Sequence, residues 1–128
     1  MEPLLEIVQL SATAEAPGLS RVMWRIGNRG SEPVELASIW LPHGQFRSEE
    51  RGLSVALAAG ESCELATSVR FVAEPGEVVE NGFVILTVRS ADETWQVFAR
   101  LRITAEPDRQ PQAEVERITV QREGSSTA

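Results

Sequence analysis

The sequence predicts an all-β protein, an antiparallel β-sandwich of about seven strands with a C-terminal extension. Three observations predict this class. Apolar and polar residues alternate with a period of two along most of the chain, as in strands with one buried face. Clusters of glycine, proline and asparagine separate these stretches. No stretch shows the longer apolar period of a convincing helix.

The first strand is expected at residues 5–14 and ends at Pro17-Gly18, which favours a turn. One of its faces carries Leu4, Glu6, Val8, Leu10 and Ala12. The second strand, residues 21–26, alternates so that Trp24 points inward. Residues 27–33 form a turn, because asparagine and glycine tolerate positive φ and Pro33 blocks a helix.

The third strand, residues 34–41, changes phase along its length. Val34 and Leu36 fit one face, whereas Ile39 and Leu41 fit the other, so a β-bulge is expected near Leu36-Ala37. Pro42-His43-Gly44 ends this strand, and the polar stretch 45–52 is expected to be a loop. Two more strands follow, at residues 53–57 and 62–72.

The last two strands form a hairpin, residues 82–89 and 94–103, with Ser90 opposite Glu93. This register places Val88 opposite Trp95 on the buried face, followed by the pairs Leu86–Val97 and Val84–Ala99. It places Ile85 opposite Phe98 and Phe83 opposite Arg100 on the other face.

The composition changes after Ile103, so residues 1–104 are expected to form the sandwich. Residues 105–128 are expected to comprise a proline-containing linker, an extra strand and a frayed tail at 124–128. The β-branched segment 115–122 has three interpretations: an eighth strand of this domain, a strand added to another molecule, or the start of a further domain.

Three parts of the sequence resemble the immunoglobulin-like and fibronectin-type β-sandwich modules of prokaryotes. They are residues 24–30 followed by Pro33-Val34, residues 57–62 before a strand, and the closing hairpin, within residues 5–103. The resemblance implies an immunoglobulin-like sandwich with Greek-key connections and a binding or spacer role, and it transfers no catalytic residue. The paired cysteines and the tyrosine corner of antibody domains are missing, since the chain has one cysteine and no tyrosine.

The formal charge of −7 argues against nucleic-acid binding, which depends on neutralising phosphates. With Cys63 as its only cysteine, the chain forms no intramolecular disulfide. The first residues are acidic where a signal peptide is basic, and no apolar stretch approaches the roughly 20 residues that span a bilayer. We therefore expect a cytoplasmic protein without membrane insertion.

The residues that could carry chemistry have ordinary structural interpretations. His43 is expected in a solvated turn, and Cys63 on the core face as an inert thiol. One cysteine and one histidine do not make a zinc site. The acidic residues Glu74, Glu77 and Glu80 lack the ligand spacing of a calcium loop. We expect no enzymatic activity, no catalytic residue, no cofactor and no metal.

We therefore expect a non-catalytic protein-interaction or structural module that binds through a sheet face or a sheet edge, with a protein partner or a second copy of itself. The expected surface comprises an apolar group with arginines at its rim: Met23, Trp40, Phe83, Ile85, Phe98, Arg100 and Arg102. Trp24 and Trp95 are expected in the core. The alternative is a carbohydrate- or small-ligand-binding module that uses Trp40 and the Pro42-His43-Gly44 turn.

Overall fold

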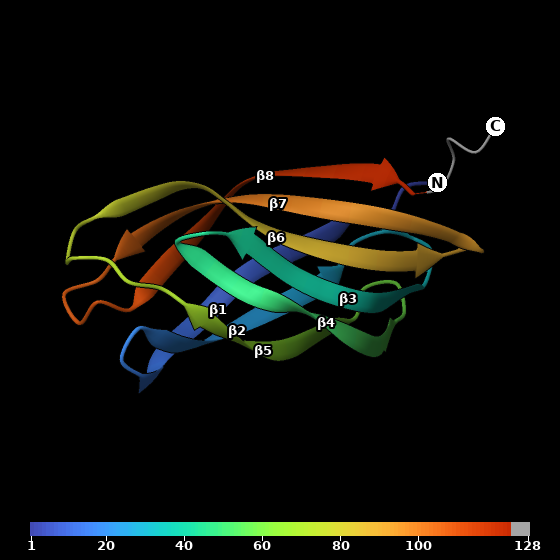
Figure 1. Cartoon of the computed structure of the whole chain (residues 1–128). Helices are drawn as coiled ribbons and strands as arrows, with labels where there is room; N and C mark the ends of the chain where they lie inside the picture. Colours follow the sequence, from blue (N-terminus) through green and yellow to red (C-terminus); the bar gives the residue numbers. More distant parts are fainter. Residues whose placement is uncertain (124–128) are drawn as a thin grey trace.

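The computed structural model describes residues 1–123, which form one strongly curled sheet of antiparallel strands (Figure 1). The eight strands are β1 (Leu5–Ala16), β2 (Leu19–Asn28), β3 (Val34–His43), β4 (Phe46–Leu57), β5 (Ser62–Arg70), β6 (Val78–Ser90), β7 (Glu93–Ala105) and β8 (Pro111–Arg122). Their order in the sheet is β1-β2-β5-β4-β3-β6-β7-β8. The all-β prediction is confirmed, with eight strands where about seven were expected. No helix of residues 1–123 is long and apolar enough to cross a membrane.

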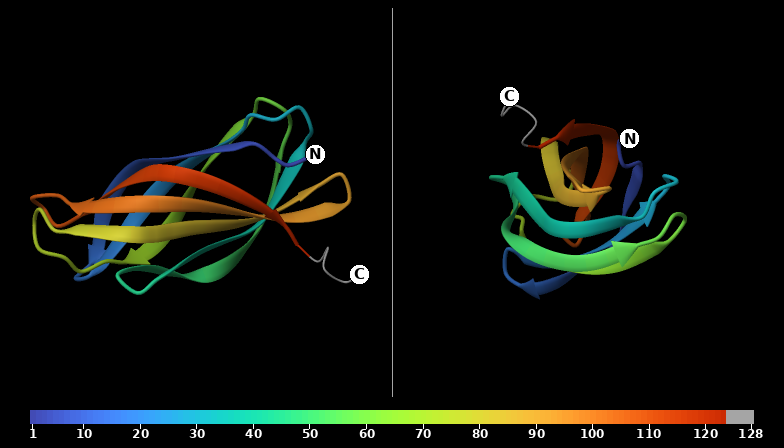
Figure 2. Two further views of the ribbon diagram at one scale, coloured as in Figure 1. Left: turned by 90° about the horizontal axis from the view of Figure 1, so that it is seen from above. Right: turned by 90° about the vertical axis from the view of Figure 1, so that its right-hand side faces the viewer.

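The sheet curls into a half-barrel in which two pairs of adjacent strands share little or no backbone pairing (Figure 2). Between β4 and β5 the register contains one residue pair, Arg47 with Arg70. Between β1 and β8 the side chain of Gln9 makes the connection. Its Nε2 donates to the carbonyl oxygen of Pro111 at 2.8 Å, and its Oε1 accepts from the amide of Ala113 at 2.6 Å. Gln9 thus satisfies two backbone groups of β8 that a neighbouring strand would otherwise pair.

The core fills the concave side of the curled sheet. Its centre is the fully buried Trp24, whose Nε1 donates to the hydroxyl of Thr67 at 2.9 Å. Phe46 packs edge-on against both Trp24 and Phe71, with ring centroids 6.3 Å and 6.0 Å apart. Trp95 is also buried, as expected. In β1 the buried side chains are Leu5 and Ile7, the opposite face to that of Leu4 and Val8.

The closing hairpin has the predicted register, with Ser90 opposite Glu93 and Val88 opposite Trp95. The pairs Ile85–Phe98 and Phe83–Arg100 are also confirmed. The β-bulge expected near Leu36-Ala37 is present as well, because both ladders of β3 shift register between Leu36 and Ser38.

Two predictions about chain segments need correction. Residues 46–52 were expected in a loop but belong to β4, because Phe46 is fully buried and the segment pairs with β3. The expected linker is short, since β7 extends to Ala105 and β8 begins at Pro111. β8 pairs along β7, which is the first of the three interpretations of this segment. The predicted frayed tail at 124–128 lies outside the described residues.

Candidate interaction surface

The convex face of β3, β6 and β7 carries a group of large apolar side chains. On β6 and β7 the alternate residues are buried in the core, so Phe83, Ile85 and Phe98 point outward and are half-buried. The register of β3 against β6 places Trp40 opposite Ile85, and that of β6 against β7 places Ile85 opposite Phe98. Trp40 is 41% exposed. We call Trp40, Phe83, Ile85 and Phe98 the outer patch.

Two arginines of β7 border the outer patch. Arg100 lies opposite Phe83, and its Nε is 3.8 Å from a carboxylate oxygen of Glu116. That Nε is buried and has no hydrogen-bond partner among residues 1–123. Arg102, on the same face of β7, has its Nε 3.6 Å from a carboxylate oxygen of Glu80. Both ion pairs are long and partly exposed, so each contributes about 0–1 kcal/mol and leaves guanidinium donors available.

Met23 does not join the outer patch. It lies on β2 between Ser11 of β1 and Ala66 of β5, on the convex face of a different part of the wall. Figure 1 shows β2 on the side of the half-barrel away from β6 and β7. The structure thus brings together Trp40, Phe83, Ile85, Phe98, Arg100 and Arg102, and it separates Met23 from them.

The outer patch is not covered by β8. This strand lies beside β7 in the same sheet, with Thr119 opposite Phe98. On the other side of the patch, the β3–β4 ladder passes from the pair Ile39–Arg51 to the pair Leu41–Ser48, so that Trp40 lies at a bulge. The acidic residues that follow Ser48 therefore come near Trp40. Sequence reasoning missed them because it treated residues 45–52 as a loop.

The other candidate residues have partners within the fold. His43 accepts a hydrogen bond from the amide of Gln45 through Nδ1, at 3.0 Å, in the turn between β3 and β4. Cys63 is partly buried against the core. Burial raises the pKa of its thiol above the ordinary value, and a backbone hydrogen bond at Ile26 lowers this pKa by a smaller amount.

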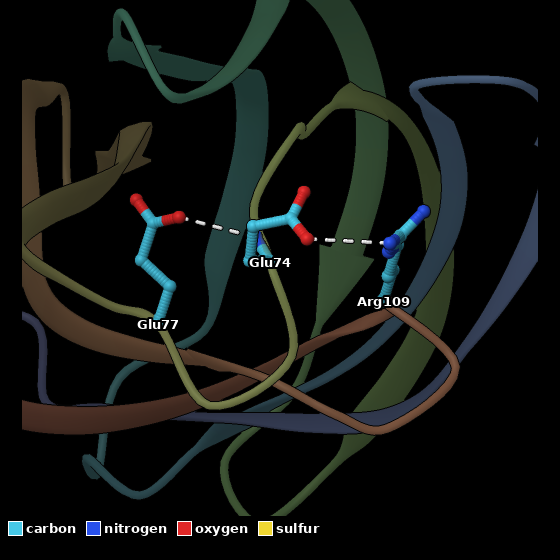
Figure 3. Close-up of polar contacts among 3 residues, drawn as sticks. All are labelled: Glu74, Glu77 and Arg109. Atoms are coloured by element: carbon cyan, nitrogen blue, oxygen red, sulfur yellow. Dashed lines mark hydrogen bonds and ion pairs between the residues drawn. The ribbon is translucent and has the colours of Figure 1, made fainter.

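The three glutamates considered for calcium have different partners, and Figure 3 shows those of Glu74 and Glu77. The carboxylate of Glu74 is 3.2 Å from a guanidinium nitrogen of Arg109, and that of Glu77 accepts from the amide of Glu74 at 3.1 Å. Glu80 pairs with Arg102. Within the described part of the chain, no group of three or more His, Cys, Asp or Glu residues is arranged to hold a metal ion.

A hollow of about 540 Å³ opens at one end of the half-barrel. It lies between the β1–β2 turn, the segment after β5 and the β7–β8 turn, and its lining includes Leu19, Phe71, Val72, Glu74 and Arg109. Sequence reasoning missed it because three segments far apart in the chain form it. Comparison of the chain with protein-family models, with curated proteins and with solved structures found no match.

Proposed function

We propose that this protein is a non-catalytic interaction module that binds another protein through the convex face of β3, β6 and β7. One observation carries the proposal: Trp40, Ile85 and Phe98 lie side by side on three neighbouring strands, facing away from the core. Large aromatic side chains are the residues that contribute most to protein–protein binding when a partner buries them.

The charges next to the outer patch indicate the chemistry of the partner. Arg100 and Arg102 have only long ion pairs, so their guanidinium groups can bind carboxylates of a partner. A suitable partner surface therefore presents apolar side chains to the outer patch and an acidic residue to these arginines. A second copy of the chain meets both requirements, since the chain has 19 acidic residues and an apolar patch of its own.

We include in this proposal an immunoglobulin-like sandwich fold and a cytoplasmic location. An immunoglobulin-like sandwich with β1-β2-β5 as one layer and the other strands as the second is supported by the single residue pair between β4 and β5. A cytoplasmic location is supported by the lone cysteine, which needs no oxidising compartment.

Phe98→Glu should weaken binding to the partner, or self-association, about thirtyfold or more, because it replaces one of the aromatic side chains of the outer patch by a charge. Sedimentation velocity measures self-association. Photo-crosslinking from position 40 in the native cell extract measures binding to another protein. Val72→Glu is the matched control, since Val72 is a 75% exposed apolar residue that follows β5 and lies outside the outer patch. Both variants should keep the parent's circular dichroism spectrum.

The proposal is wrong if the parent sediments as a monomer and position 40 forms no crosslink that depends on Phe98. Equal loss of binding in Phe98→Glu and Val72→Glu would also contradict it, since a general effect of charge would then explain both.

Carbohydrate binding is the second candidate, favoured by the exposed ring of Trp40 beside the Pro42-His43-Gly44 turn. Of the three tryptophans, Trp24 and Trp95 are buried, so a change in fluorescence on adding sugar reports mainly Trp40. The neighbours of Trp40 within the outer patch are apolar, so only the acidic residues that follow Ser48 could hydrogen-bond sugar hydroxyls there. We therefore expect no saturable change in a titration with soluble oligosaccharides. A saturable change that Trp40→Ala removes would favour the sugar-binding function.

A further inference from the structure

Two arginines face each other where β4 and β5 meet. Arg47 and Arg70 form the only residue pair between these strands, and both are exposed on the convex face, because their neighbours Phe46 and Val69 are buried. Directly opposite residues of an antiparallel pair have Cβ atoms about 4.5–5.5 Å apart, and like charges at that spacing repel. The one register pair of the β4–β5 ladder therefore carries two like charges, which is unfavourable.

Neither arginine of this pair forms an ion pair within residues 1–123. The six ion pairs of this region involve Arg29, Arg89, Arg100, Arg102, Arg109 and Arg122. Neither Arg47 nor Arg70 takes part in one, although the chain carries a formal charge of −7. The nearby Glu15 accepts a hydrogen bond from the hydroxyl of Ser68 at 2.7 Å.

The two arginines border a hollow of about 390 Å³ at the junction of β4 and β5, which Leu19, Ser48, Glu49 and Ser68 complete. The hydroxyl oxygen of Ser48 is buried and has no hydrogen-bond partner in the described region. The hollow thus combines two guanidinium groups that form no ion pair within residues 1–123 with one carboxylate and with serines of both strands.

We propose that this hollow binds one tetrahedral oxyanion, a phosphate or sulfate group, between Arg47 and Arg70. Each guanidinium is a planar fork of N–H donors, and a tetrahedral anion has enough oxygens to accept from both forks. The anion removes the repulsion between the arginines and ties β4 to β5 at their single junction. Glu49 and the negative charge of the chain oppose the binding of any anion and of large polyanions most, so the two guanidinium groups must outweigh them. This site lies on other strands than the outer patch and does not depend on the proposed function.

The test uses inorganic phosphate and O-phosphoserine as probes, against sodium chloride at the same ionic strength. We expect saturable heat in calorimetry and a higher melting temperature with the probes than with chloride. Arg70→Gln should weaken binding about tenfold or more, since it removes one of the two forks. Arg70→Gln should also melt no lower than the parent in chloride, because it relieves the repulsion. Tighter binding of O-phosphoserine identifies a phosphate ester as the natural form, whereas tighter binding of the free ion identifies inorganic phosphate.

The control is Arg25→Gln, which removes an exposed arginine of β2 that forms no ion pair within residues 1–123 and lies outside the hollow. It should bind phosphate like the parent. Amide exchange at residues 46–48 and 69–71 should slow in phosphate in the parent and not in Arg70→Gln. Absence of binding for both probes overturns the proposal, and so does an equal effect of the two substitutions, which would indicate unspecific attraction of anions.

Discussion

Trp24→Ala should lower the free energy of unfolding by about 3–5 kcal/mol, which is the usual cost of removing a large aromatic side chain from a core. Trp24 has no exposed surface and packs against Phe46, which in turn packs against Phe71. The substitution leaves a cavity in this cluster. It also removes the indole N–H that donates to the hydroxyl of Thr67. This buried hydroxyl then loses that hydrogen bond.

Urea denaturation followed by circular dichroism measures this loss. Trp40→Ala is the matched control, because it makes the same change at a side chain that is 41% exposed. Its cost should stay below about 1.5 kcal/mol, since a large part of the ring is already exposed to solvent and its removal leaves no cavity in the core. Equal costs for the two substitutions would show that the concave side of the sheet is not the packed core described above.

Asn28→Ala should lower the free energy of unfolding by about 2–4 kcal/mol, since it leaves three buried or partly buried backbone groups without the partners that its side chain provides. The side chain of Asn28 is 1% exposed. Its Nδ2 donates to the carbonyl oxygens of Glu32 at 2.9 Å and Leu57 at 3.1 Å, and its Oδ1 accepts from the amide of Gly30 at 3.0 Å. One side chain therefore joins the end of β2 to the loop that precedes β3 and to the end of β4.

The same denaturation experiment measures this effect. Amide hydrogen exchange should be faster at residues 57–61. In this segment the amide of Gly60 donates to the carbonyl oxygen of Asn28, and the carbonyl oxygen of Glu61 accepts from the amide of Asn28. The control is Asn81→Gly, which removes the chain's other asparagine at an exposed position with φ of 60°, a conformation that glycine adopts readily. A loss for Asn28→Ala no greater than that for the control would rule out this role of Asn28.

The parts of the fold that depend on local sequence were predictable. The register of the closing hairpin follows from a short turn and the alternation around it, so Ile85, Phe98 and Arg100 were assigned correctly to the convex face. The bulge near Leu36 was predictable because the alternation of apolar residues in the sequence of β3 changes phase there. β4 was only partly recognised, because its first half has polar side chains on the solvent side and two register shifts interrupt its alternation. The isolated Phe46 was the only sign that this segment reaches the core.

Features that depend on which strands become neighbours were not predictable. Trp40 joins the outer patch because β3 pairs with β6, whereas Met23 is excluded because β2 pairs with β1 and β5. Nothing local in the sequence specifies this order of strands. The same is true of the contact between Arg47 and Arg70 and of the hollow at the end of the half-barrel, which segments distant in the chain create.

The connection through Gln9 has a mechanical consequence. The first residue of β1 and the last residue of β8 lie at the same end of the molecule (Figure 2), and one side-chain amide is the hydrogen-bonded link between these two strands among the described residues. A force that pulls Leu5 and Arg122 apart acts on the pairs Leu5–Asn28 and Trp95–Arg122 before any others. The outer strands then peel away one pair at a time, as in unzipping, so the molecule resists stretching between these two points only weakly.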